Sequence, residues 1–151
     1  MTRVLGVHGI WKYRYFAGNG WSPDAAAEAI SVDWSTWLAS SAVDLRVAYY
    51  AHLLHPATPH GGAEDDPETL TPTAQAMLID WVEQLIDEPV LAHGARTAWA
   101  RQAADWVSQH FGVATRRFVL AFCREVDTYL SDPARRATVR DTVAAAVEGH
   151  R

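Results

Sequence analysis

Residues 3–11 read RVLGVHGIW, and this stretch decides the fold expected for the chain. Its apolar part, Val4 to Val7, is too short for a helix and too apolar for a half-exposed strand. It therefore predicts a strand buried on both faces, as in parallel sheets. His8 and Gly9 follow the carboxyl end of that strand, which is the edge where open parallel sheets bind ligands. A glycine there lets the backbone bend and present N–H groups to an anion, so the stretch predicts half of an oxyanion hole.

A helix and a second strand follow this stretch. Ser22, Pro23 and Asp24 form a helix start, and apolar spacing continues the helix to about Ala39. Residues 44–51 form the second strand. A strand, a crossover helix and a strand make a βαβ unit with two parallel strands, here at about 3–7 and 44–51. The sequence therefore predicts an α/β fold with an incomplete sheet, and His8 and His52 at one edge.

The remainder of the chain is helical by pattern, which brings the expected number of helices to about five. A length of 151 residues fits a single domain, 1–151. We expect it to comprise a βαβ unit at 1–52, a polar loop at 53–70, a helical insertion at 71–130 and a final helix at 133–148.

Composition narrows the class of protein. Hydrophobic residues make up 49% of the chain and charged residues 21%, which excludes a disordered chain. The net charge of -5 arises from scattered acidic groups, so we expect no nucleic-acid partner. No stretch approaches the length of a membrane span, and Cys123 is the only cysteine. We expect a cytoplasmic protein with no membrane partner and no cofactor.

Residues 4–11, VLGVHGIW, and the order of the expected elements resemble the N-terminal half of the α/β-hydrolase superfamily, in particular bacterial serine esterases, lipases and peptidases. In that family, the loop after the His-Gly strand supplies an oxyanion-hole N–H. The resemblance implies that Gly9, Ile10 and Trp11 are oxyanion-hole candidates and that His8 orients their loop. It also places the final helix, 133–148, just before the strand that carries the nucleophile.

The chain departs from this family at the nucleophile. No serine lies in a Gly-x-Ser-x-Gly elbow, and the family takes its acid and base from later strands. The resemblance therefore implies a truncated, hydrolase-like segment that is inactive alone. If completed, it would act on a small ester or amide substrate.

Two other functions stay open. The first is a non-catalytic scaffold or interaction module that completes its sheet by self-association or with a complementing polypeptide, because a two-stranded sheet leaves unpaired edges. The second, weaker alternative is a metal-dependent hydrolase. Imidazole and carboxylate groups bind zinc, and the candidate ligands, in the stretch 52–66, are His52, His55, His60 and Asp65.

Overall fold

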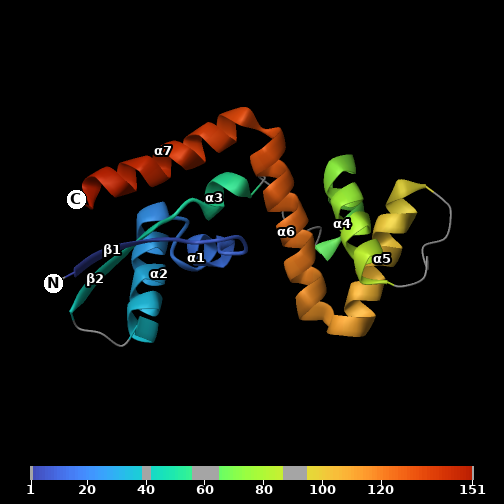
Figure 1. Ribbon diagram of the computed structural model, residues 1–151, viewed down its shortest axis with the longest axis horizontal. Helices are drawn as coiled ribbons and strands as arrows, with labels where there is room; N and C mark the ends of the chain where they lie inside the picture. Colours follow the sequence, from blue (N-terminus) through green and yellow to red (C-terminus); the bar gives the residue numbers. More distant parts are fainter. Residues whose placement is uncertain (1, 39–41, 56–64, 87–94, 151) are drawn as a thin grey trace. The chain divides into compact units, whose positions relative to one another are not determined.

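The computed structural model describes four stretches of the chain, which belong to two compact units, each with its own buried hydrophobic cluster (Figure 1). The described stretches are 2–38, 42–55, 65–86 and 95–150. Unit 1 comprises Met1–His55 and Asp132–Arg151, and unit 2 comprises Pro56–Ser131.

Unit 1 is built on a parallel pair of strands. β1 (Thr2–Val7) and β2 (Val43–Ala48) are joined through the helix α2 (Pro23–Leu38). The strands stay in register along their whole length, starting with Thr2 opposite Val43. The strand–helix–strand order predicts this parallel pairing. It brings the residues that follow β1 and β2 to one edge of the sheet.

Helices lie on both faces of this sheet. α2 packs on one face, where Ile30 is fully buried and the ring of Trp34 lies against Gly6. A Cβ atom at position 6 would lie 2.7 Å from Cζ3 of Trp34, so this approach requires glycine. α7 (Pro133–Gly149) packs on the other face and buries Val139 (Figure 1).

The expected fold class, α/β with an incomplete hydrolase-like sheet, is wrong. Helices account for 74% of the described residues and the sheet there has only two strands, so the chain is mainly helical. Seven α-helices occur in the described stretches, against about five expected. The expectation that β1 is buried on both faces is also wrong. None of its six residues is buried, because no described strand lies on its outer side.

Two short helices occupy segments that were expected to be loop or strand. α1 (Tyr13–Gly18) lies in the expected loop after the first strand. α3 (Ala51–Leu54) begins at the end of the second strand expected at 44–51. β2 ends earlier, at Ala48, because the N–H of Tyr50 bonds to the side chain of His8 and not to the backbone of β1.

Unit 2 contains three long helices after a short 3-10 helix. Thr71 caps the first of them by accepting a hydrogen bond from the N–H of Ala74 at 3.1 Å. Gly112 ends the second with a φ of 87°, in the region that favours glycine. The buried cluster includes Leu78, Leu120 and Cys123. The elements are η2 (Pro67–Thr69), α4 (Pro72–Leu85), α5 (Arg96–Phe111) and α6 (Val113–Ser131).

Candidate functional site

The candidate site lies where β1 and β2 end. His8 and Gly9 follow β1, whereas Tyr49 and Tyr50 follow β2. The rings of His8 and His52 both contact the ring of Tyr49, at centroid distances of 5.0 and 5.8 Å. The prediction that the two histidines reach the same edge of the sheet is therefore confirmed.

His8 is tied to the backbone through both of its ring nitrogens. Its Nε2 atom accepts a hydrogen bond from the N–H of Tyr50 at 3.0 Å, so this nitrogen carries no proton. The proton is on Nδ1, which donates to the carbonyl oxygen of Gly9 at 2.6 Å. The side chain is only 1% exposed, and its ring stacks on that of Tyr50 at 4.1 Å. These contacts join the end of β1 to the segment that follows β2.

The surroundings of His8 favour its neutral form. Burial lowers the pKa of His8, the hydrogen bond to Gly9 opposes this effect, and Lys12 and His52 lower the pKa further. To accept a proton, Nε2 would have to release the N–H of Tyr50. His8 is therefore placed to position the backbone and not to act as a general base.

The contacts of His8 also fix the two peptide groups that follow it. The Tyr50 hydroxyl donates to the carbonyl oxygen of His8, and Nδ1 of His8 holds the carbonyl oxygen of Gly9. In a trans peptide the N–H points away from the preceding C=O, so the N–H groups of Gly9 and Ile10 point away from these partners. Within the described stretches, neither N–H has an acceptor. Two successive donors are thus available to an anion.

Trp11, the third expected donor, has an unusual backbone conformation. Its φ of 62° lies in the left-handed region that bulky residues rarely adopt, and its side chain is 46% exposed. Trp21, on the other side of α1, shares this conformation, with a φ of 59° and an exposure of 60%. Strained residues of this kind persist only where the surrounding structure holds them.

Tyr49 holds α1 at this edge. Its hydroxyl donates to the carbonyl oxygen of Lys12 at 2.9 Å and accepts from the N–H of Phe16 at 3.1 Å. One buried side chain thereby fixes both the start and the first turn of a short helix. Sequence reasoning missed Tyr49 and Tyr50. The available signal was a tyrosine pair at the end of an apolar strand.

His52 and His55 pack against aromatic rings. His52 lies 5.8 Å from the ring of Tyr49 and 5.2 Å from that of Phe16, and burial lowers its pKa. Its Nδ1 atom is buried and has no hydrogen-bond partner among the described residues. His55 stacks on Tyr13 at 3.6 Å.

The described residues do not assemble the metal site considered from the sequence. His52 and His55 belong to unit 1, whereas Asp65 belongs to unit 2 and pairs with Arg117 at 2.9 Å. His60 lies outside the described residues. Across the four described stretches, no group of three or more His, Cys, Asp and Glu side chains could hold a metal ion.

A serine paired with a histidine base is also missing from the described part of the chain. No serine hydroxyl there bonds to a histidine ring. Ser31 and Ser35 donate to carbonyl groups of their own helix, and Ser131 donates to Asp127. A serine hydrolase of the triad type needs its hydroxyl within reach of a histidine, so the described residues form no such serine–histidine pair.

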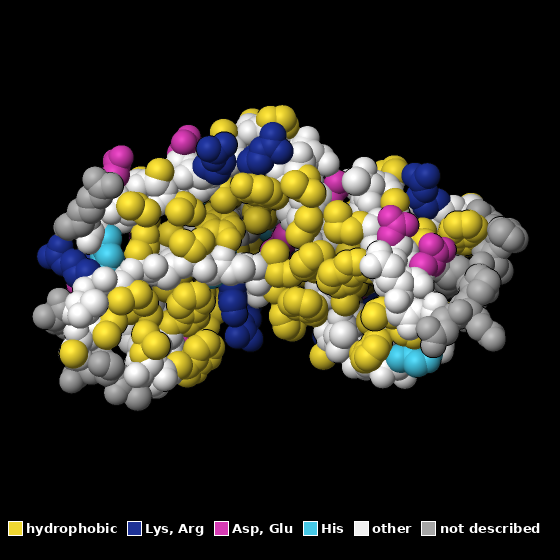
Figure 2. All heavy atoms as spheres, in the orientation of Figure 1, with side chains coloured by type: hydrophobic (Ala, Val, Ile, Leu, Met, Phe, Trp, Pro, Cys, Tyr) yellow, Lys and Arg dark blue, Asp and Glu magenta, His cyan; other side chains and the backbone are white. Residues whose placement is uncertain are grey.

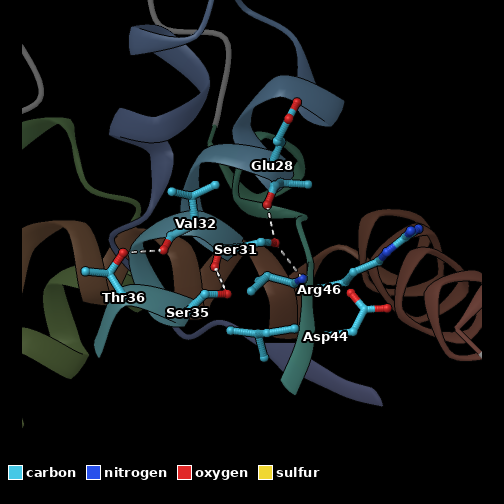
Figure 3. A pocket seen from close by; sticks show the side chains of 10 residues that line it. Glu28, Ser31, Val32, Ser35, Thr36, Asp44 and Arg46 are labelled. Carbon is cyan, nitrogen blue, oxygen red and sulfur yellow. Dashed lines mark hydrogen bonds between the residues drawn. The ribbon is translucent and has the colours of Figure 1, made fainter. Parts of the chain in front are cut away.

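A separate groove of about 790 Å³ runs between α2 and β2. Figure 3 shows Ser31, Ser35 and Thr36 lining it from α2, with Asp44 and Arg46 contributed by β2. The Ser31 hydroxyl accepts the N–H of Val47 at 2.9 Å across this groove. The groove therefore follows the outer edge of β2 and not the ends of the strands.

No protein-family model, no curated protein and no solved structure matches the chain. None of the helices in the described stretches has the length and apolar character needed to cross a membrane. The resemblance to the α/β-hydrolase superfamily thus depends on residues 4–11 and on the order of the neighbouring elements.

Proposed function

We propose that residues 8–11 form the oxyanion-binding segment of a serine-hydrolase-like site that acts on an ester or amide carbonyl. The proposal rests on the two N–H groups of Gly9 and Ile10, whose preceding carbonyl groups are held by Tyr50 and His8. Such donors stabilise the charge that develops on a carbonyl oxygen. In working enzymes, loss of one donor costs about 100- to 1,000-fold in rate. Trp11 follows in the same turn as a third candidate.

The attacking group, in this proposal, comes from another polypeptide. The positioning role of His8 supports this division, because both of its ring nitrogens are already engaged. The site would need no cofactor. We further propose a cytoplasmic location, which agrees with the free and buried thiol of Cys123, since disulfides are rare in that compartment.

An NMR titration with methylphosphonate, a tetrahedral anion, tests the proposal. We expect the amide resonances of Gly9 and Ile10 to shift progressively as the anion is added. Ile10→Pro removes one donor and should weaken binding by about tenfold or more, as expected for a hydrogen bond to a charged group. Ile10→Ala keeps the N–H and should bind within about twofold of the unaltered chain. Unmoved Gly9 and Ile10 amides, or equal binding by the two variants, would contradict the proposal.

A second candidate function is an interaction module that pairs through its sheet. One observation favours it: β1 has an apolar sequence but an open outer side, and Val7 is 51% exposed. A two-stranded sheet is marginally stable without further strands or packing. Light scattering at several concentrations checks this function, because a pairing module should increase in mass as its concentration rises.

A further inference from the structure

The two N–H groups of the oxyanion-binding segment are held in different ways. The N–H of Ile10 is set by a local contact, because Nδ1 of His8 donates to the carbonyl oxygen of the next residue, Gly9, at 2.6 Å. The N–H of Gly9 is set by a contact that spans 42 residues, in which the Tyr50 hydroxyl donates to the carbonyl oxygen of His8. The direction of the Gly9 N–H therefore depends on where Tyr50 lies, whereas that of the Ile10 N–H does not.

The position of Tyr50 depends in turn on the protonation state of His8. The N–H of Tyr50 donates to Nε2 of His8 at 3.0 Å, and the two rings stack at 4.1 Å. A neutral imidazole accepts this bond, but an imidazolium carries a proton on both nitrogens and cannot accept it. The ring is only 1% exposed, so no solvent is at hand to take the new N–H while Tyr50 stays in place. A proton on Nε2 therefore separates Tyr50 from His8.

The surroundings of His8 keep its ring neutral near pH 7. Burial is the main cause that lowers the pKa of His8, and Lys12, which precedes α1, and His52, on α3, lower it further, against the hydrogen bond to Gly9. From α7, Arg135 donates to a backbone carbonyl oxygen of α3 at 3.1 Å, which adds another positive charge. Figure 2 shows hydrophobic side chains on both sides of the strands of unit 1. The other titratable groups against the ring are the phenols of Tyr49 and Tyr50.

We propose that the oxyanion-binding segment is an acid-sensitive switch: protonation of His8 releases Tyr50 and removes the Gly9 N–H as an anion donor, while the Ile10 N–H is kept. This inference concerns the regulation of the site described under the proposed function and rests on that function. In acid, the peptide group between His8 and Gly9 loses the hydroxyl that holds it and turns freely. A hydrogen bond to a charged group is worth about tenfold or more in affinity, so loss of this donor weakens anion binding.

The switch acts against the ordinary electrostatic effect of acid. Protonated side chains attract anions, so a chain in which His8 only gained a charge would bind an anion more tightly at low pH. The buried ring of His8 offers no contact of its own to an anion, whereas the Gly9 N–H is a direct donor. The direction in which affinity changes with pH therefore separates the switch from a simple gain of charge.

NMR titrations with methanesulfonate between about pH 8 and pH 4.5 test the switch, because this tetrahedral anion keeps its charge while histidine titrates. The unaltered chain should lose about tenfold or more in affinity at the acid end, with the midpoint of the His8 titration. There the anion should still shift the Ile10 amide but not the Gly9 amide. His8→Gln cannot take up this proton and should bind no more weakly in acid. His52→Gln is the matched control, which keeps His8 and should lose affinity as the unaltered chain does.

Constant or tighter binding by the unaltered chain in acid would overturn the switch. A loss of affinity that persists in His8→Gln, or that disappears in His52→Gln, would overturn it as well. Absence of any shift of Gly9 and Ile10 at the alkaline end would contradict the proposed function and the switch together. Equal shifts of both amides at the two ends would contradict the switch alone.

If His8→Gln unfolds, hydrogen exchange of the unaltered chain without an anion decides. The protection of the Tyr50 amide, relative to an unstructured chain at the same pH, should disappear at the midpoint of the His8 titration. Protection that persists after His8 is protonated, or a His8 ring that stays neutral to the acid end of the range, would overturn the switch.

Discussion

The side chain of His8 fixes the backbone at the carboxyl ends of both strands, through its bonds to Gly9 and Tyr50. The apolar run before His8 predicted that this residue lies at the carboxyl end of a strand, and His8 does follow β1. Its partners could not be predicted, because Tyr50 is 42 residues away in sequence and reaches His8 only after the strands pair. The left-handed backbone conformations of Trp11 and Trp21 could not be predicted either, since no local sequence pattern indicates a tryptophan with a positive φ.

Replacing His8 should destabilise the fold. His8→Ala leaves the N–H of Tyr50 and the carbonyl oxygen of Gly9 without their buried partner, which should lower the free energy of unfolding by about 1–3 kcal/mol. Urea denaturation followed by tryptophan fluorescence measures this change. His110→Ala is the matched control, because His110 is exposed and its loss should cost less than about 0.5 kcal/mol. Equal effects of the two substitutions would contradict the role assigned to His8.

The lowered pKa of His8 predicts a pH dependence of stability. The folded-state pKa lies below the ordinary value of about 6.5, so the unfolded chain takes up the proton first as the pH falls. The neutral ring therefore stabilises the fold above about pH 6.5, and this contribution is lost at lower pH. His8→Gln removes the titration, whereas His52, whose pKa burial also lowers, still titrates. Between pH 7.5 and 5.5, the free energy of unfolding should fall more in the unaltered chain than in His8→Gln; equal losses would count against this account.

At the level of elements, local patterns predicted the long helices and failed on the short ones. The proline and capping residues before α4 and α7 mark their first turns, and both helices begin there. α1 has only six residues, which is too short for a periodic apolar pattern to predict it, and it is held in place by the hydroxyl of Tyr49. The second strand was predicted too long, because the contact that ends β2 comes from the side chain of His8.

The contact between β1 and α2 predicts a steric effect. Gly6→Ala adds a methyl group 2.7 Å from Cζ3 of Trp34 and should lower the free energy of unfolding by about 1–3 kcal/mol. Gly18→Ala adds the same group where no atom lies within 4 Å, and it serves as the control. Thermal denaturation compares the two. If Trp34→Leu is combined with Gly6→Ala, most of the added loss should disappear, and no relief would argue against this contact.

For the whole molecule, the error in fold class has a physical origin. The parallel strands were correctly paired, but a sheet of only two strands contributes little of the described structure. Most described residues lie in helices whose apolar stripes pack against each other, including the three helices that surround the cluster of unit 2. Periodicity predicts such helices but does not show whether they cover a large sheet or one another.

The sequence contains no Gly-x-Ser-x-Gly elbow, and no described serine bonds to a histidine ring, so we predict that the chain alone does not hydrolyse esters. Release of nitrophenol from a short-chain nitrophenyl ester should equal the buffer rate, and a fluorophosphonate probe should not label the protein. The matched control is the urea-unfolded chain, which should give the same rate. Turnover that disappears when one serine is replaced would show that the chain carries its own attacking group.

His8 and Tyr50 hold the backbone so that two successive N–H groups, those of Gly9 and Ile10, remain free among the described residues. Residue-resolved hydrogen exchange by NMR tests this directly. The amide of Tyr50 is bonded to a buried ring nitrogen and should exchange slowly, whereas the amides of Gly9 and Ile10 should exchange about as fast as those of an unstructured chain. Protection of Gly9 and Ile10 as strong as that of Tyr50 would contradict the account.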